Sequence, residues 1–443
     1  MQHQGKISPQ RITINEELSP GFGKSIHTFS QSKDICQDTV VARKTLTFDA
    51  LRYLFQGALD RELSTILMLT AVSALGASIS SKSALKALAI VGSTSMIFTP
   101  MLQQLVDRFC WDSMKISALY FTLMGIAFFC AAFVDSWILF FTFMAFAKIF
   151  DRQQIPLMIG VYVDNYPRMS RGFNVGIALT CMPIGGMLFA SIASYIFAKK
   201  PGSLSGLLFL ASLLALCCAI CFLKIPIRKV VSKPYPPFRD SFKLIFQDRV
   251  FATILLLYSF IAIANQMTLP LRVEYLASHR HGLDISYGGI VAIFGIIQPL
   301  ASVVSGPFWG KLYDRVSLIT MRQCVTICFL IGIPLFFATD NLTTIYLASV
   351  LLGIGRSGGV IFWSLWISAI APRDRVNEYM GANAAIMGLR DALSPILGYF
   401  LLEFAGPFVV GVVAFILLTF SMFGFERLCR SYAYMRRISI IGK

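Results

Sequence analysis

Long apolar runs alternate with short polar breaks along most of the chain. Twelve runs have about the 20 residues that a helix needs to cross a bilayer. They lie near 64–81, 86–106, 115–134, 137–163, 173–198, 203–223, 250–275, 286–309, 318–338, 343–370, 376–402 and 407–425. Membrane β-strands need only about ten alternating residues, and backbone groups must be satisfied inside lipid. The pattern therefore predicts an all-α membrane protein with twelve transmembrane helices.

The composition agrees with this pattern and excludes a soluble protein. Of the 443 residues, 56% are hydrophobic and only 14% are charged, whereas soluble chains carry about 25% charged residues. A soluble chain of this length would divide into two or three domains. The apolar runs leave no stretch long enough for a sizeable soluble domain. A sensor or signalling protein would be expected to have one, so this pattern argues against that class.

Lysine and arginine are divided unevenly between the loops. Twelve spans put both termini on one side, and alternate loops then share a side. One set of loops holds sixteen of these residues, and the other holds five, namely Lys82, Lys86, Lys199, Lys200 and Arg280. The positive-inside rule makes the basic set and both termini cytoplasmic, and we expect the inner membrane of a bacterium. The net charge of +16 thus reports topology and contact with anionic lipid, and we expect no nucleic-acid partner.

The first sixty residues differ in kind from the rest. Residues 1–40 are polar and lack the apolar core of a secretory signal. Between residues 46 and 63, apolar positions recur at helical spacing opposite Asp49, Arg52 and Asp60. Two interpretations remain open: an amphipathic helix on the inner leaflet or an extension of the first span. We expect a tail at 1–63, a six-helix half at 64–223, a basic linker at 224–249, a second half at 250–425 and a tail at 426–443.

Four landmarks repeat at nearly one offset. Asp107-Arg108 and Asp314-Arg315 lie 207 positions apart, and Arg152 and Arg356 lie 204 apart. Pro167 and Pro372, and likewise Gly176 and Gly381, lie 205 apart. The chain is therefore expected to consist of two pseudo-symmetric six-helix halves, an arrangement that many transporters use to place a substrate site near the midplane.

Several motifs carry a family resemblance. The stretch GPFWGKLYDR, from Gly306 to Arg315, resembles the G-x-x-x-G-x-x-x-D-R signature of the major facilitator superfamily between spans eight and nine. TPMLQQLVDR, from Thr99 to Arg108, looks like its counterpart between spans two and three. Arg152-Gln153 and GIALTCMPIGG are similar to the family's span-four and span-five motifs. The resemblance covers about residues 60–425 and implies this family's fold, a monomer and secondary transport rather than catalysis.

The first motif also has a physical interpretation. Gly306 and Gly310 clear one helix face so that a neighbouring helix can approach, and Asp314 can face the positive N-terminus of another helix. The resemblance implies that Asp314-Arg315 latches onto the start of span five and that Asp107-Arg108 latches onto span eleven near Arg373 and Arg375. The alternative is a simple turn that caps span nine.

Charged residues inside the spans are candidates for a binding site, because each would be costly against lipid. They are Asp151, Arg152, Arg356, Arg390 and Asp391, and the polar pair Asn265-Gln266 lies in span seven. Arg356 and Asp391 are expected to pair, which leaves Arg152 and Arg390 for an anionic ligand; Asp151 and Asp391 are candidates for coupling. Structural pairing remains the competing interpretation. The resemblance implies that spans one, four, seven and ten line the cavity, which favours Arg152, Asn265, Gln266 and Arg356.

Other chemistry is not indicated. The Cys218/Cys221 pair lies inside a span, and the sequence contains no P-loop, HExxH or G-x-S-x-G motif, so no metal, cofactor or ATP drive is expected. The function is expected to be secondary active transport of a small solute, driven by protons or by exchange. An anionic metabolite is weighed against export of lipophilic compounds by proton antiport, and a non-transporting membrane enzyme or sensor is the third alternative.

Overall fold

The structure is a computed structural model that describes residues 22–60, 81–109, 111–199, 204–227, 238–277, 292–372 and 375–431, with a few single residues besides. Two compact units divide the chain, Met1–Val41 and Ala42–Lys443. Helix α1 (Phe22–Leu59) begins in the first unit and ends in the second. Among the described residues, the first unit contributes only the beginning of this helix.

The described residues form helices joined by short connections, without strands. The first half contains the end of α1, α3 (Ser81–Ser95), η1 (Met96–Phe98), α4 (Thr99–Arg108), α5 (Ser113–Ala131), α6 (Trp137–Gln153), α7 (Ile155–Asn165), α8 (Arg171–Lys199) and α9 (Leu204–Lys224). The second half contains α11 (Arg249–Ala277), η2 (Ala292–Ile297), α13 (Gln298–Arg315), α14 (Leu318–Phe337), α15 (Leu342–Ile370) and α16 (Val376–Cys429). The short helix α10 (Phe238–Gln247) lies in the connection between the halves.

Local chemistry fixes where several helices begin and break. The side chains of Asp112, Ser317 and Asn341 cap α5, α14 and α15 by accepting backbone N–H groups. Gly406 interrupts α16 with a φ of 79°, directly before Pro407. Glycine adopts a positive φ without steric cost. Proline has no backbone N–H group, so Pro407 cannot donate a helical hydrogen bond to the preceding turn. Helix α16 is therefore two spans joined at a break.

Among the described residues, twelve spans result when the end of α1 is counted as the first span and each broken helix is counted as the chain traces it. Eight described helices are long and apolar enough to cross a membrane, and α16 is one of them although it contains two spans. The segments α3–η1–α4 and α6–α7 each form one span in two or three pieces, which are shorter than a full crossing. The all-α, twelve-span fold expected from the sequence is confirmed.

For the first span, the structure describes only the residues that precede the predicted run. The apolar run at 64–81 lies almost entirely outside the described residues. Helix α1 instead packs inside the first half: a side chain on Gly57 would collide with the backbone of Met182 in α8, and one on Gly185 with the backbone of Leu54. Asp49 and Arg52 are fully buried, so residues 45–59 do not form a helix with its polar face in solvent. The polar side chains satisfy one another, and that is why this face can be buried.

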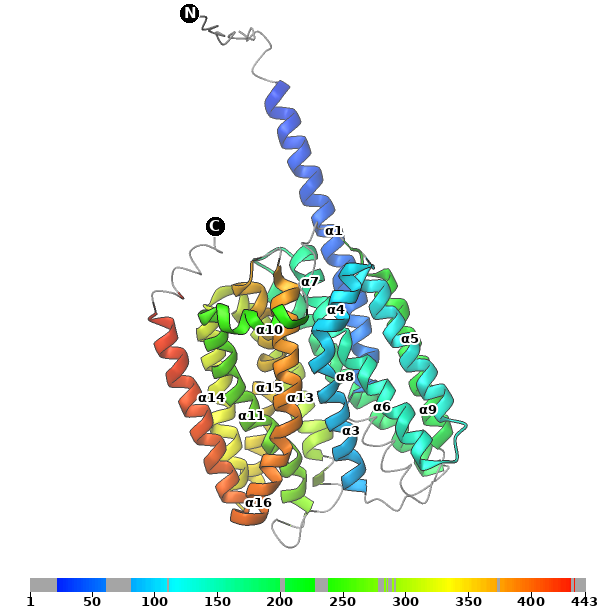
Figure 1. The fold of residues 1–443 in the computed structure, drawn as a ribbon, viewed down its shortest axis with the longest axis vertical. Coiled ribbons are helices and arrows are strands. Elements are labelled where there is room, and N and C mark those ends of the chain that lie inside the picture. The colour runs from blue at the N-terminus through cyan, green and yellow to red at the C-terminus, as the bar shows by residue number, and fades with distance from the viewer. Residues whose placement is uncertain are drawn as a thin grey trace, which may run out of the picture. The chain divides into compact units, whose positions relative to one another are not determined.

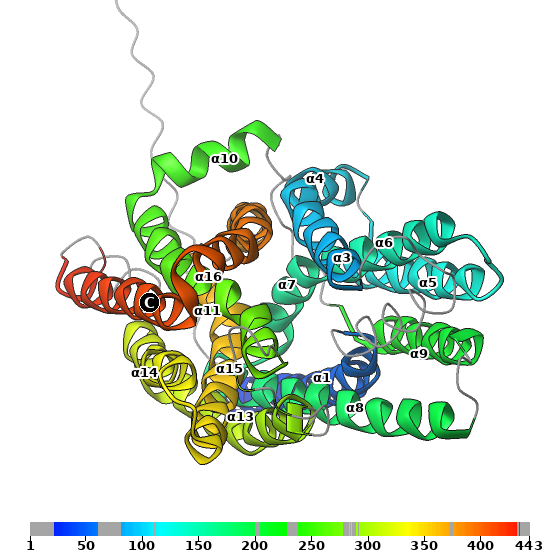
Figure 2. The ribbon, with the colours of Figure 1, turned by 90° about the horizontal axis from the view of Figure 1, so that it is seen from below.

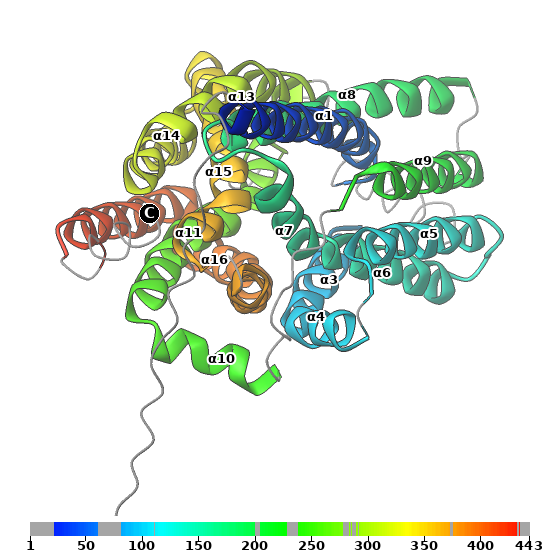
Figure 3. The same ribbon diagram turned by 90° about the horizontal axis from the view of Figure 1, so that it is seen from above.

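The two halves lie beside each other and are joined by two pairs of helices. In Figure 2 and Figure 3, α5, α6 and α9 gather on one side and α11, α14 and α15 on the other. Helix α8 packs along α13, and α3 and α4 pack along the first part of α16. Figure 1 shows α4, α7 and α10 at one end of the unit. This end, called the basic end below, carries the connections with Arg168, Lys224, Arg249 and Arg315.

Candidate functional site

The basic end is closed by a glycine-lined contact between α8 and α13. A Cβ atom on Gly172 would lie 2.7 Å from the carbonyl oxygen of Gly310, and one on Gly310 would lie 2.6 Å from that of Gly172. A Cβ atom on Gly306 would collide with the hydroxyl of Thr180. Real Cβ atoms do not approach other atoms so closely, so these glycines permit the two helices, one from each half, to touch.

Asp314 fastens this contact at its end. Its two carboxylate oxygens accept hydrogen bonds from the backbone N–H groups of Gly172 (2.7 Å) and Phe173 (2.8 Å), in the first turn of α8. A carboxylate at a helix N-terminus is favoured both by the unpaired N–H groups and by the helix dipole. The neighbouring Arg315 is exposed. The position of Asp314 is the one the sequence analysis expects for a latch across the two halves.

The second latch stays a prediction. The side chain of Asp107 and residue 373 lie outside what the structure describes, and Arg108 is exposed. Arg375 forms a two-pronged salt bridge with Glu378 in the first turn of α16, with both N–O distances at 2.6 Å.

An apolar cluster fills the space between the halves further from the basic end. Met96 of η1, Ala384 and Met387 of α16 are buried together, and Ile155 of α7 and Trp363 of α15 pack against them. We call these five residues the apolar cluster. It draws on helices from both halves, so it must come apart whenever the halves separate at this level.

Arg152 lies one helical turn beyond the apolar cluster, on the side away from the basic end. Its guanidinium is 3.9 Å from a carboxylate oxygen of Asp151 and 4.0 Å from one of Asp60. Asp391 of the other half also interacts with it electrostatically. Both distances exceed those of charge-assisted hydrogen bonds, about 2.7–2.9 Å, and 36% of the side chain is exposed. Carboxylates therefore offset its charge without occupying its N–H donors.

Arg356 occupies the matching place in the second half. It precedes Trp363 by seven residues on α15, which is two helical turns, so both residues lie on the same face. Its side chain is exposed. The expected pair of Arg356 with Asp391 is not formed: Asp391 accepts a hydrogen bond of 3.2 Å from Nε of Arg390. Side chains of adjacent helical residues start in different directions, but the arginine side chain is long enough to fold back and reach the carboxylate of the next residue.

The remaining sequence candidates in span seven are held inside their own helix or partly buried. The side-chain oxygen of Asn265 accepts a hydrogen bond of 2.9 Å from Arg272, which also donates to Thr268. Gln266 is partly buried. Asn265 is thus fixed by a buried arginine on α11.

A buried polar network in the first half escaped the sequence analysis. Arg52 donates to Asp49 (2.6 and 2.9 Å) and to Gln56 (2.6 Å), and Gln56 donates to Asp151 (3.0 Å). Tyr162 donates to the second oxygen of Asp49 at 2.9 Å. The network runs along α1 to Asp151 and so reaches the neighbour of Arg152. The available signal was the spacing of Asp49, Arg52 and Gln56 at i, i+3 and i+7, which places them on one helix face.

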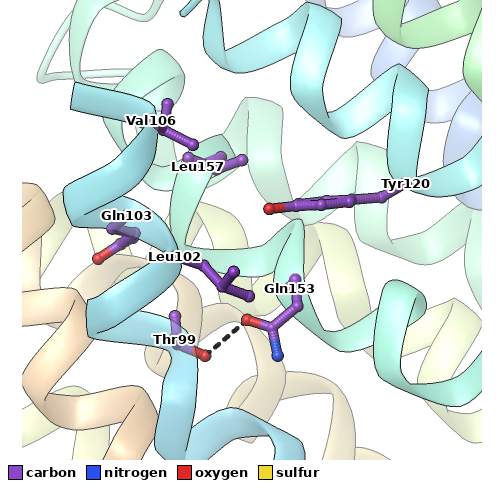
Figure 4. Close-up of a pocket in the computed structure, with 7 residues that line it drawn as sticks. All are labelled: Thr99, Leu102, Gln103, Val106, Tyr120, Gln153 and Leu157. Carbon is purple, nitrogen blue, oxygen red and sulfur yellow. Dashed lines mark hydrogen bonds between the residues drawn. The ribbon is translucent and has the colours of Figure 1, made fainter. Parts of the chain in front are cut away.

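Gln153 points away from this network toward α3 and α4. It accepts a hydrogen bond of 3.0 Å from Thr99 and donates one of 2.9 Å to the carbonyl of Ser95. Figure 4 shows Thr99, Gln103, Tyr120 and Gln153 around a small pocket with Leu102, Val106 and Leu157. Through these two hydrogen bonds, Gln153 connects the α3–η1–α4 span to the break between α6 and α7.

Within the described residues, no group of three metal-ligating side chains occurs.

Comparison with known proteins identifies the family. The family model of the Major Facilitator Superfamily matches residues 54–301 and 290–428 of this chain. The match begins inside α1. No curated protein sequence matches the chain.

Solved structures share the fold at low sequence identity. The human organic anion transporter MFSD10 (TETRAN) is similar with a TM-score of 0.71 and 14% identity, over 87% of this chain and 99% of that chain. The proton:xylose symporter XylE has a TM-score of 0.70 and 13% identity, over 88% and 96%. The E. coli fucose:proton symporter FucP has a TM-score of 0.65 and 11% identity, over 88% and 99%. The chain therefore belongs to the Major Facilitator Superfamily and is an integral, multi-pass membrane protein of the secondary-transporter type.

Proposed function

We propose that this chain carries a small anionic metabolite across the membrane by alternating access, with proton coupling or exchange. The observation that carries the proposal is the pair Arg152 and Arg356, one from each half, both beyond the apolar cluster and both accessible. A guanidinium offers a forked donor that matches a carboxylate or phosphate. A solute held between two such groups would contact both halves at once, as alternating access requires.

The basic end supplies the closed gate in this proposal. The contact of α8 with α13, fastened by Asp314, and the apolar cluster both join the two halves on one side of the arginines. We assign the basic end to the cytoplasm because of its lysine and arginine content. The state described is then closed toward the cytoplasm, and transport requires the Asp314 contact to break.

Proton coupling is supported by the chemistry beside Arg152. Asp151 is buried and accepts a hydrogen bond from Gln56, so a proton on this carboxylate would change the balance of charge around Arg152. Two of the structurally similar proteins are named proton symporters. Asp391 is the corresponding candidate in the second half, because it interacts with both Arg390 and Arg152.

Counterflow into proteoliposomes tests the proposal. The purified protein is preloaded with one member of a panel of phosphorylated, carboxylated and lipophilic cationic solutes, and uptake of the labelled solute is measured. We expect exchange with an anionic solute, lost in Arg356→Gln and kept in the control Arg430→Gln, which changes an exposed arginine at the end of α16. Exchange confined to lipophilic cations would favour the exporter alternative and contradict the proposal.

The orientation has its own test. Asn341 lies at the start of α15 and Met169 in the exposed connection before α8, at opposite ends of the unit. Cysteine at position 341 should react with an impermeant thiol reagent in intact cells, and cysteine at position 169 only after permeabilisation. The reverse pattern would overturn the cytoplasmic assignment of the basic end.

A further inference from the structure

Two arginines from different helices lie against one tyrosine ring in the interior of the second half, and only one of them has a carboxylate partner. The guanidinium carbon of Arg322, on α14, lies 4.8 Å from the ring centre of Tyr258, and that of Arg390, on α16, lies 4.9 Å from the same ring. Only 2% of Arg322 and 7% of Arg390 are exposed. Phe362 and Trp366 pack on Tyr258 and complete an aromatic wall. We call Arg322, Arg390, Tyr258, Phe362 and Trp366 the arginine cluster.

Several N–H groups of the arginine cluster have no hydrogen-bond partner among the described residues. Nε of Arg322, Nη1 of Arg390 and the indole N–H of Trp366 are buried and have no hydrogen-bond partner among the described residues. Nε of Arg390 is the donor that binds Asp391. Buried polar groups in proteins are nearly always hydrogen-bonded, and an exception calls for an explanation such as an ion that occupies the space.

The charges point to the same conclusion. Arg322 interacts electrostatically with Tyr258 and Arg390, and with no carboxylate among the described residues. Among the described residues, Asp391 is the carboxylate that interacts with Tyr258. Two arginines and one aspartate leave a net charge of +1 in a buried, aromatic environment, and an uncompensated buried charge costs several kcal/mol.

We propose that the arginine cluster binds one small monovalent anion, of the size and charge of chloride, between Arg322 and Arg390. One such ion neutralises the excess charge and accepts the unused N–H groups. A doubly charged phosphate would change the net charge of the cluster from +1 to −1, so the charge balance favours a monovalent ion. The aromatic wall adds ring edges, which carry partial positive charge. This site lies in the second half alone and does not depend on the identity of the transported solute.

Thermal unfolding of the purified full-length protein tests this site. At constant ionic strength, replacing sodium gluconate by sodium chloride should raise the midpoint in a saturable manner, by about 3 °C or more at saturation. A parallel titration with sodium formate shows whether a small carboxylate fills the same site. An equal midpoint in gluconate, chloride and formate would overturn the proposal.

Two variants make the test specific. Arg322→Met removes the excess charge at similar side-chain length, so it should abolish the anion effect while the protein stays folded even in gluconate. Arg430→Met, at an exposed arginine, should keep the full effect. An anion effect that survives in Arg322→Met contradicts the proposal. If Arg322→Met does not fold, bromide located by anomalous scattering in wild-type crystals decides: density between Arg322 and Arg390 supports the site, and density only elsewhere overturns it.

Discussion

The two halves place an arginine against a tyrosine at matching positions, but only one half neutralises it. Tyr53 on α1 and Tyr258 on α11 lie 205 positions apart, the offset of the internal repeat. The guanidinium of Arg52 stacks on Tyr53 at 3.7 Å from the ring centre and binds Asp49 on the same helix. Around Tyr258, Arg322 and Arg390 approach from two other helices, and only Arg390 binds a carboxylate, that of Asp391.

This difference separates a structural charge cluster from one that needs a ligand. In the first half, each oxygen of Asp49 accepts a hydrogen bond and Arg52 uses all three of its nitrogen atoms. In the second half, donors remain unused and the charge does not balance. Repeated folds therefore do not imply repeated chemistry, and the positions must be compared contact by contact.

The largest expected effect comes from removing the arginine in each half. Arg52→Met strands Asp49 in the interior, and breaking such a pair by removing one partner costs about 3–5 kcal/mol. Arg322→Met removes an excess charge and should cost little or increase stability in gluconate. The fraction of monodisperse protein after heating measures both. Asp49→Asn combined with Arg52→Met should recover part of the loss, and equal losses for Arg52→Met and Arg322→Met would erase the proposed difference between the halves.

A smaller effect should follow from giving the second half the carboxylate that it lacks. Ile254 matches Asp49 at the repeat offset and lies one turn before Tyr258 on α11, fully buried. Ile254→Asp should be tolerated, because Arg322 and Arg390 lie nearby, and it should remove the dependence on chloride. The matched control Leu271→Asp, at another fully buried position of α11, should fail to fold. If neither Ile254→Asp nor Leu271→Asp folds, the inference of an excess positive charge around Tyr258 is wrong.

The central arginines provide the third comparison. Arg152 is surrounded by Asp60, Asp151 and Asp391, whereas Arg356 is exposed. Replacement by lysine keeps the charge and removes the forked donor, so each variant should weaken solute affinity, by roughly tenfold for a lost charge-assisted hydrogen bond. Half-saturation in counterflow measures this affinity. If Arg152→Ala is rescued by Asp151→Ala or Asp391→Ala while both lysine variants bind normally, the arginines are structural.

The twelve-span fold could be predicted from hydropathy, but the burial of residues 45–59 inside the first half could not. The run at 64–81 is the more apolar segment, whereas α1 carries Asp49, Arg52 and Gln56 through the first half. Hydropathy counts charges as a cost, and it cannot register that these three side chains satisfy one another. The close approach of Gly57 to Met182 fixes α1 against α8. These residues lie far apart in the sequence, so a local hydropathy pattern cannot predict their contact.

Individual site contacts were predictable only where a motif fixed both partners. The family signature places Asp314 at the end of one helix and names the start of another, and the structure has that contact. No comparable pattern links Asp391 to Arg390 rather than to Arg356, because side-chain rotamers decide between them. Arg322 is one of the sixteen basic residues assigned to the loops, because an arginine near a helix end resembles an ordinary loop charge.

We propose that the halves alternate about the site and that Asp314 holds the basic end shut. Spin labels on cysteines at Met169 and Thr320, exposed residues near the starts of α8 and α14, report the distance between the halves at the basic end. Labels at Ser136 and Leu342 report the opposite end. The native cysteines are first replaced, and transport by that background is verified.

Double electron–electron resonance then compares this background with Asp314→Asn, which loses the charge that faces the first turn of α8. We expect the distance between positions 169 and 320 to shift to longer values in the variant, while the distance between positions 136 and 342 becomes shorter. Unchanged distances at both ends, or lengthening at both, would contradict alternating access controlled by this contact.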